Sequence, residues 1–259
     1  MTKLLSRSHA SLGSAKPVVE LTTTGTGPWP VWDRFLAIDG VPAMHIGNIC
    51  GTCSFFFERL DGASKPSIDI LRTDLAGGLV DIHPATIERF GALLPEGRYA
   101  LALIECTPVR VEQGTADDYF VRDKQDPYDD PMEPNTHYYR LNERSAVDLG
   151  KDQYGDSNLG FEFIIPLAQP VDAATISSYR ERIDAGVRPT AISLSVLDIK
   201  QPSNGDTHWC MAHYLLDGHH KVEAAAQAQK PVTLLAFLPL EGGICREEDL
   251  LHFLSAYPT

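Results

Sequence analysis

The part of the chain best suited to chemistry is a run of five consecutive residues: Asp217, Gly218, His219, His220 and Lys221. An apolar stretch, residues 211–216, precedes the run, and an alanine-rich stretch, residues 222–228, follows it, which predicts a buried strand leading into a helix. At the start of a helix, backbone N–H groups and the positive end of the helix dipole favour an anion. Lys221 can neutralise a phosphate, and each histidine can donate a hydrogen bond to it. We therefore expect a phosphate site at this turn.

The same five residues have a purely structural interpretation. Asp217 would cap the helix, Gly218 would make the turn, and the histidines would lie on the surface. In a functional site, Asp217 would instead fix the tautomer of one imidazole or orient a metal ion. Two adjacent histidines favour the functional interpretation, because a helix cap requires neither of them.

A second candidate is the Cys-x-x-Cys pair formed by Cys50 and Cys53. Such a pair can supply two of the four ligands of a tetrahedral zinc site, but the chain contains no second pair. Cys210 and His213 have ligand-like spacing, yet they lie three residues apart on a predicted strand and should face opposite sides. Three interpretations therefore remain for Cys50 and Cys53: half of a zinc site, a redox pair, or two semi-buried thiols.

The elements that must position the turn are clearest in the C-terminal part of the chain. Asp172 should cap a helix that continues to about residue 184, and Gly186 should end it. Pro231 should end the helix that follows the turn. Strands are predicted at residues 161–165, 191–199, 208–216 and 232–238.

The N-terminal part is predicted to be mostly β, and four regions follow from the composition. Residues 1–16 are small and polar, which indicates a flexible tail, and residues 17–113 should hold a hairpin around Asp39-Gly40 and a strand at 98–107. Residues 114–159 are rich in Asp, Pro and Gly, which is typical of an acidic irregular insertion. Residues 160–259 should form a C-terminal module.

Residues 161–238 resemble the ParB/sulfiredoxin-like superfamily. The order of a strand, a helix ending at Gly186, a strand, and a strand entering a D-G-H-H-K turn and a helix is similar to the D-G-H-H-R turn of that superfamily. The resemblance implies that Gly218 lets the backbone approach a phosphate and that His220 and Lys221 contact it. Lys221 replaces the usual arginine, which loses the bidentate fork. His219 stands where sulfiredoxins carry their reactive cysteine, so reduction of a cysteine sulfinate is not implied.

Composition limits the classes of partner. The formal net charge is −13 and the pI is about 5.0, which disfavours general binding to nucleic acid. No apolar run approaches the roughly 20 residues of a membrane span, and the N-terminus lacks the apolar core of a secretory signal. The odd number of cysteines, five, favours a reducing compartment, so we expect a cytoplasmic protein that does not contact membranes.

Together these observations predict an α+β protein with a mixed sheet, a ParB/sulfiredoxin-like C-terminal module and a mostly β N-terminal region. The expected function is binding of a nucleotide or another small phosphate ligand at residues 217–221, with a nucleoside triphosphate and Mg²⁺ as cofactors if the protein transfers phosphoryl groups. The alternative is a non-catalytic interaction or regulatory protein that holds zinc at Cys50 and Cys53 and binds a protein partner.

Overall fold

The computed structural model describes residues 2–24, 33–48, 55–64, 72–123, 134–141, 147–153, 155–169, 172–201, 206–240 and 245–258. Its helices are α1 (Arg72–Gly77), α2 (Pro84–Gly91), α3 (Tyr119–Arg122), α4 (Ala173–Asp184), α5 (His219–Ala228) and α6 (Glu247–Ser255). Its strands are β1 (Lys3–Leu12), β2 (Val19–Thr24), β3 (Asp33–Ile38), β4 (Val41–Asn48), β5 (Glu58–Arg59), β6 (Gly97–Cys106), β7 (Val109–Val111), β8 (Tyr138–Arg140), β9 (Val147–Lys151), β10 (Ser157–Pro166), β11 (Thr190–Lys200), β12 (Thr207–Asp217) and β13 (Val232–Pro239).

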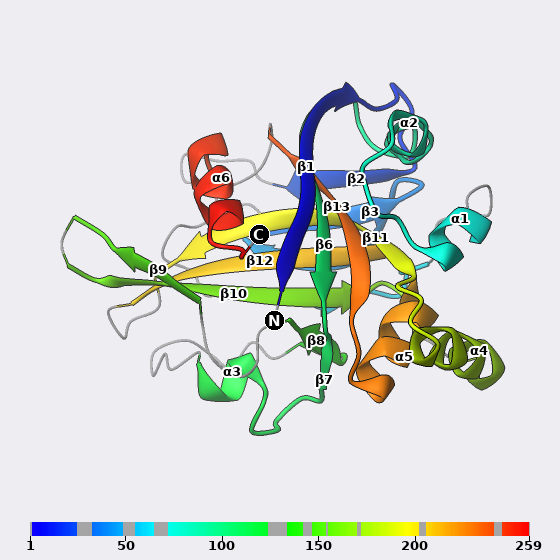
Figure 1. Cartoon of the computed structure of the whole chain (residues 1–259). Coiled ribbons are helices and arrows are strands. Elements are labelled where there is room, and N and C mark those ends of the chain that lie inside the picture. The colour runs from blue at the N-terminus through cyan, green and yellow to red at the C-terminus, as the bar shows by residue number, and fades with distance from the viewer. Residues whose placement is uncertain are drawn as a thin grey trace.

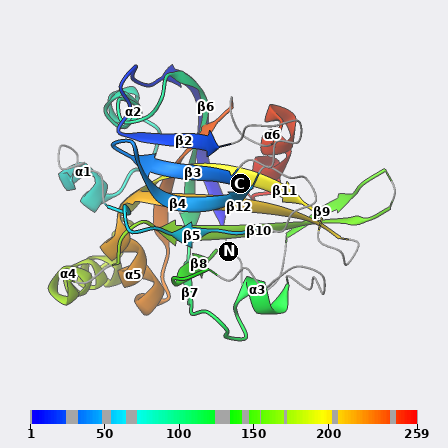
Figure 2. The same cartoon turned by 180° about the vertical axis from the view of Figure 1, so that it is seen from behind.

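Two sheets lie one behind the other (Figures 1 and 2). The larger is a mixed sheet in the order β1-β6-β13-β11-β12-β10-β8-β7, with β9 also paired to β10. Its strands turn from nearly upright at β1 and β6 to nearly horizontal at β10 and β12 in Figure 1, so the sheet twists strongly. The smaller sheet, β2-β3-β4-β5, covers one face of the larger. The predicted α+β class with a mixed sheet is confirmed.

Apolar side chains fill both faces of the larger sheet. Between the sheets, Leu36 and Met44 of the smaller sheet join Phe163, Leu194 and Phe237 of the larger sheet in one buried cluster. A second cluster on the opposite face brings strand residues under α5 and α6 and includes Val222, Ala225, Phe253 and Leu254. The central strands are therefore buried on both sides, which explains their nearly continuous apolar sequences.

The helices α4 and α5 each connect two strands that run in opposite directions. The chain runs β10-α4-β11 and β12-α5-β13, and β10 lies parallel to β12 while β11 lies parallel to β13. The carboxyl ends of β10 and β12 therefore share one edge of the sheet, and α4 packs against α5 beside it (Figure 1). In open, mostly parallel α/β sheets, ligands bind outside the carboxyl ends of the strands, and β10 and β12 form such a parallel pair within this mixed sheet.

Most local predictions agree with the structure. Asp39 and Gly40 have φ values of 50° and 74°, as a tight hairpin turn between β3 and β4 requires. The Asp172 side chain accepts hydrogen bonds from the backbone N–H groups at the start of α4, and Gly186 follows that helix with φ 94°. Pro84 begins α2.

Three regional predictions are corrected. Residues 3–12, predicted as part of a flexible tail, form the edge strand β1, whose small Ser and Ala side chains mask a strand pattern. Described parts of residues 114–159, predicted as an irregular insertion, supply β8 and β9 to the larger sheet. Residues 160–259 do not have a sheet of their own, because β13 pairs with β6. Pairings this distant in sequence leave no local signal.

Candidate functional site

The predicted turn lies at the end of the sheet where β10 and β12 both finish. The predicted strand, turn, helix and strand are confirmed as β12, Gly218, α5 and β13. Gly218 has a left-handed backbone, with φ 98° and ψ 19°. A Cβ atom added there would lie 2.6 Å from the Cβ of Ala191 on β11. The close backbone approach that glycine permits is therefore made to a neighbouring strand.

The ammonium of Lys221 is engaged inside the fold. Its Nζ donates to Oδ2 of Asp217 and to the backbone carbonyl of Thr190, each at 2.8 Å. Only 3% of Lys221 is exposed. Asp217 and Lys221 thus fasten the start of α5 to β11, and a phosphate would have to displace both contacts to reach the Lys221 charge.

The two histidines differ in their surroundings. His219 is buried, and its Nε2 accepts a hydrogen bond of 3.1 Å from the backbone N–H of Ala168, so the ring is neutral at that nitrogen. His220 is partly exposed and lies close enough to Asp172 to lower the pKa of that carboxyl, after the larger effect of the hydrogen bonds from Thr175. Of the five predicted residues, His220 is the one that combines imidazole chemistry with access to solvent.

A polar cavity of about 310 Å³ opens at the carboxyl end of β10, and residues 217–221 are not part of its lining. Its lining includes Arg59, Asn135, Thr136 and Gln169. Gln169 directly follows the Ala168 residue that contacts His219, and its amide donates to Thr136 Oγ1 at 3.0 Å. Asn135 exchanges two hydrogen bonds with the backbone of Arg59, at 2.8 and 2.9 Å, so the lining is fixed by its own contacts.

The Arg59 guanidinium gives this cavity a cation. Its Nε donates to the carbonyl of Leu167 at 2.8 Å, which holds the side chain across the end of β10. Asp61 also lines the cavity, so both signs of charge are present. Such a lining suits a small polar ligand with an anionic group and hydrogen-bond donors.

A buried polar cluster lies next to the cavity. Glu223 of α5 accepts hydrogen bonds from Tyr139, at 2.6 Å, and from Arg110, at 3.1 Å. Burial alone would raise the pKa of Glu223, but hydrogen bonds from Tyr139 and Gln227 and the charge of Arg110 outweigh it and lower the pKa. Burial, followed by the charge of Arg110, lowers the pKa of His137. The cluster therefore favours a carboxylate and a neutral imidazole.

A second polar cluster, which the sequence does not reveal, crosses three strands of the larger sheet. Ser195 Oγ lies 2.8 Å from Nδ1 of His213, and Nε2 of His213 lies 3.2 Å from Oε1 of Glu162. Tyr257 also donates to Oε1 of Glu162. This chain of groups could carry a proton, yet Ser195, His213 and Glu162 are at most 2% exposed. No substrate reaches them in this conformation, so the cluster acts as polar packing within the core.

The structure offers no further metal candidate in the regions that it describes. Cys50 and Cys53 lie outside these regions. Within them, no group of three His, Cys, Asp or Glu side chains is arranged to hold a metal ion. Cys210 packs in the core between the sheets, while His213 points to the opposite face, as predicted for residues three apart on a strand.

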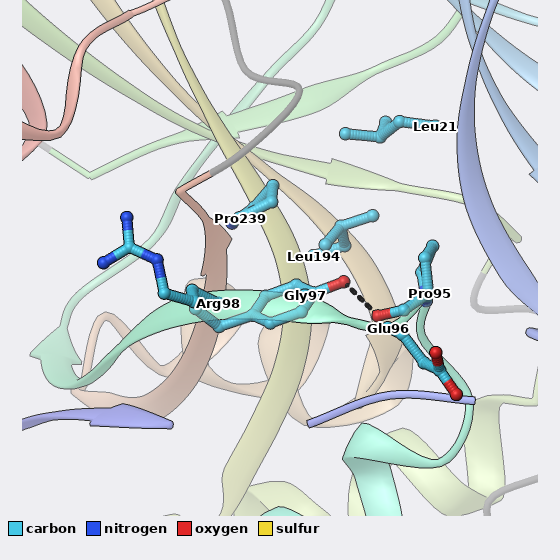
Figure 3. Close-up of a pocket in the computed structure, with 8 residues that line it drawn as sticks. Leu21, Pro95, Glu96, Gly97, Arg98, Leu194 and Pro239 are labelled. Atoms are coloured by element: carbon cyan, nitrogen blue, oxygen red, sulfur yellow. Dashed lines mark hydrogen bonds between the residues drawn. The ribbon is translucent and has the colours of Figure 1, made fainter. Parts of the chain in front are cut away.

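A smaller cavity of about 140 Å³ lies between β2 and the larger sheet (Figure 3). Leu21, Leu194 and Pro239 give it an apolar lining. The Tyr99 hydroxyl donates to the Pro95 carbonyl at 2.8 Å, and burial raises the pKa of Tyr99 to about 12. The Arg98 guanidinium extends away from the apolar side chains (Figure 3). The cavity is therefore less suited to a charged ligand than the one at the carboxyl end of β10.

Comparison with known proteins gives no functional assignment, because no family model, curated protein or solved structure matches the chain. None of the helices in the described regions is long and apolar enough to span a bilayer.

Proposed function

We propose that the protein binds a small phosphate-bearing ligand in the polar cavity at the carboxyl end of β10. The observation that carries the proposal is the position of this cavity: it joins the Arg59 cation to the loop that contacts His219. The same edge holds the strand-turn-helix order for which the ParB/sulfiredoxin resemblance implies a phosphate site. In this proposal Arg59 supplies the positive charge that contacts the phosphate, which the sequence suggests for Lys221.

The chemistry of the lining supports a phosphate over an apolar ligand. Arginine presents several N–H donors in a plane, which matches two oxygens of a phosphate. Thr136 and Gln169 add a hydroxyl and an amide at the cavity wall. Asp61 disfavours a bare anion and favours a ligand that also carries hydrogen-bond donors, such as the hydroxyl groups of a nucleotide or sugar phosphate.

Thermal unfolding in the presence of inorganic phosphate, AMP and ATP tests the proposal, with Mg²⁺ present and absent. A ligand that binds only the folded state raises the unfolding midpoint, and the rise grows with the logarithm of the ligand concentration once that concentration exceeds the dissociation constant. We expect at least one of these ligands to do so in the native protein and in Arg89→Met, which removes an exposed arginine on α2. Arg59→Met should abolish the shift.

Arg59 also bonds to the Leu167 carbonyl, so Arg59→Met removes a structural contact together with the cation. Gln169→Ala is the control, because it changes the cavity lining and leaves the Arg59 contact in place. It should weaken the ligand shift without removing it. Absence of a shift with all three ligands, or an equal shift in Arg59→Met, would contradict the proposal.

A further inference from the structure

The larger sheet ends at β1, a ten-residue strand. It pairs with β6 on one side, and no described strand lies on the other. The N–H of Leu240 donates to the carbonyl of Arg98. In the antiparallel register of β6 and β13, the backbone N–H and C=O groups of the even-numbered β6 residues therefore point toward β13, and those of the odd-numbered residues point toward β1. In the antiparallel register with β1, the backbone groups of Arg7, His9 and Ser11 therefore point away from the sheet. They form a hydrogen-bonding edge.

One end of this edge already holds a backbone partner. The N–H of Leu4 donates to the carbonyl of Pro258, near the C-terminal end of the chain, at 3.3 Å. A bulge between Leu4 and Ser6 interrupts the register there, whereas residues 6–12 pair regularly with β6. The remaining part of the edge keeps a regular antiparallel register, which an added strand can extend.

A groove follows the edge between β1 and α6, which lie next to each other in Figure 1. One cavity of about 410 Å³ is lined by β1 residues 4–7 and by Leu254 and Tyr257. Another of about 290 Å³ is lined by β1 residues 9–11, by Leu251 of α6 and by two residues of β6, so it also reaches over the face of the sheet inside β1. Because the two cavities succeed one another along both elements, an extended chain could follow β1 while its alternate side chains contact α6.

The charge of the edge indicates the occupant. The β1 sequence, KLLSRSHASL, contains two basic residues and a histidine but no acidic residue, in a chain with a net charge of −13. Glu247, an acidic residue of the groove, is paired with Arg98 at 3.1 Å, and no described side chain forms an ion pair with Arg7. Two copies of β1 would bring like charges together, whereas an acidic strand would be attracted.

We propose that an extended, acidic peptide segment of a partner protein adds to the β1 edge and lies in the groove against α6. Backbone hydrogen bonds to Arg7, His9 and Ser11 supply the pairing. An acidic side chain of the peptide meets Arg7, and apolar side chains on the same face of the added strand meet Leu251 and Leu254. This site is separate from the cavity at the carboxyl end of β10.

Fluorescence anisotropy with two labelled ten-residue peptides tests the proposal. One peptide repeats valine-threonine-glutamate-threonine and the other repeats valine-threonine-lysine-threonine, so that valine and the charged residue alternate on the same face of the strand. We expect the native protein to bind the glutamate peptide at least about tenfold more tightly than the lysine peptide. His9→Pro removes one outward N–H and no bond to β6, so it should weaken the glutamate peptide about tenfold. His9→Ala keeps the N–H and should bind like the native protein.

A second variant keeps the test decisive if His9→Pro fails to fold. Arg7→Glu changes only the exposed side chain and should reverse the preference between the two peptides. The proposal is overturned if the glutamate peptide does not bind at millimolar concentration, or if it binds the native protein and a folded His9→Pro equally. It is also overturned if sedimentation shows a dimer that His9→Pro abolishes, because the edge would then belong to a second copy of the chain.

Discussion

At the scale of single residues, the ionisable groups around α5 are held by contacts within the protein. Lys221 lies between Asp217 and the Thr190 carbonyl, and Glu223 lies between Tyr139 and Arg110. A buried charge that loses its partner is costly, because neither water nor another group replaces the lost interaction. The first role of these residues is therefore to fix the start of the helix.

Lys221→Met should reveal this structural role. It leaves the largely buried Asp217 carboxylate without its cation, so we expect a loss of about 3 kcal/mol in the free energy of unfolding. The double variant with Asp217→Asn should recover part of that loss. Urea unfolding measures the free energy of unfolding of the single and the double variant. If Lys221→Met instead kept its stability and lost only its response to phosphate, Lys221 would be a ligand-binding residue.

His208 should make the stability of the protein depend on pH. Burial lowers the pKa of His208 from 6.5 to about 4, and its Nδ1 lies 2.8 Å from the Tyr119 hydroxyl. The unfolded chain therefore takes up a proton near pH 6.5, whereas the folded protein does so only near pH 4. Stability is fully present above pH 6.5 and falls as the pH drops towards 4, by about 2 to 3 kcal/mol.

The measurement is urea unfolding at pH 7.0 and at pH 4.5. His208→Asn should be less stable at neutral pH but should lose less stability on acidification than the native protein. An equal loss in His208→Asn and the native protein would assign the pH dependence to other groups.

At the scale of elements, the start of α5 is defined by the fit between Gly218 and β11. The left-handed backbone favours glycine, and the Ala191 side chain leaves no room for a methyl group. The sequence predicts the turn, because Asp-Gly after an apolar run is a local signal. It does not predict that Gly218 contacts Ala191, which is more than twenty residues earlier in the chain.

Gly218→Ala should therefore cost more than the backbone strain alone. We expect a loss of about 3 kcal/mol, from the left-handed conformation and from the overlap with Ala191. Gly186 offers a matched control, because it has a similar φ of 94° and no atom within 4 Å of an added Cβ. Gly186→Ala should cost about 1 to 2 kcal/mol. Equal losses in the free energy of unfolding, measured with urea, would show that the Ala191 side chain moves aside without lowering stability.

The candidate site shows where local sequence patterns stop being informative. Asp217 to Lys221 stand out because charged residues interrupt an apolar stretch, and their place at a strand-helix junction is confirmed. Arg59 and Gln169 carry no such signal, because each follows ordinary strand residues. They line one cavity only because β5 and β10 lie close together in the fold.

At the scale of the whole molecule, one buried ion pair joins the two sheets. Arg34 of β3 donates to Asp198 of β11 at 2.5 Å and to the Ile46 carbonyl at 3.1 Å, and the side chains of the pair are 5% exposed. The residues are 164 positions apart, so the sequence gives no indication that they meet. A buried pair of this kind specifies how two sheets align, because any shift leaves both charges unpaired.

Breaking this pair should weaken the whole molecule rather than one element. Arg34→Met leaves the Asp198 carboxylate buried and unpaired, so we expect a loss of about 3 to 5 kcal/mol, and the added change Asp198→Leu should restore much of it. Lys230→Met breaks the exposed pair with Asp184 and should cost less than about 1 kcal/mol.

Urea unfolding followed by tryptophan fluorescence and circular dichroism should give coincident transitions in each variant, because the sheets share one core. If Arg34→Met instead produced two separate transitions, the sheets would be independent folding units held together mainly by this pair.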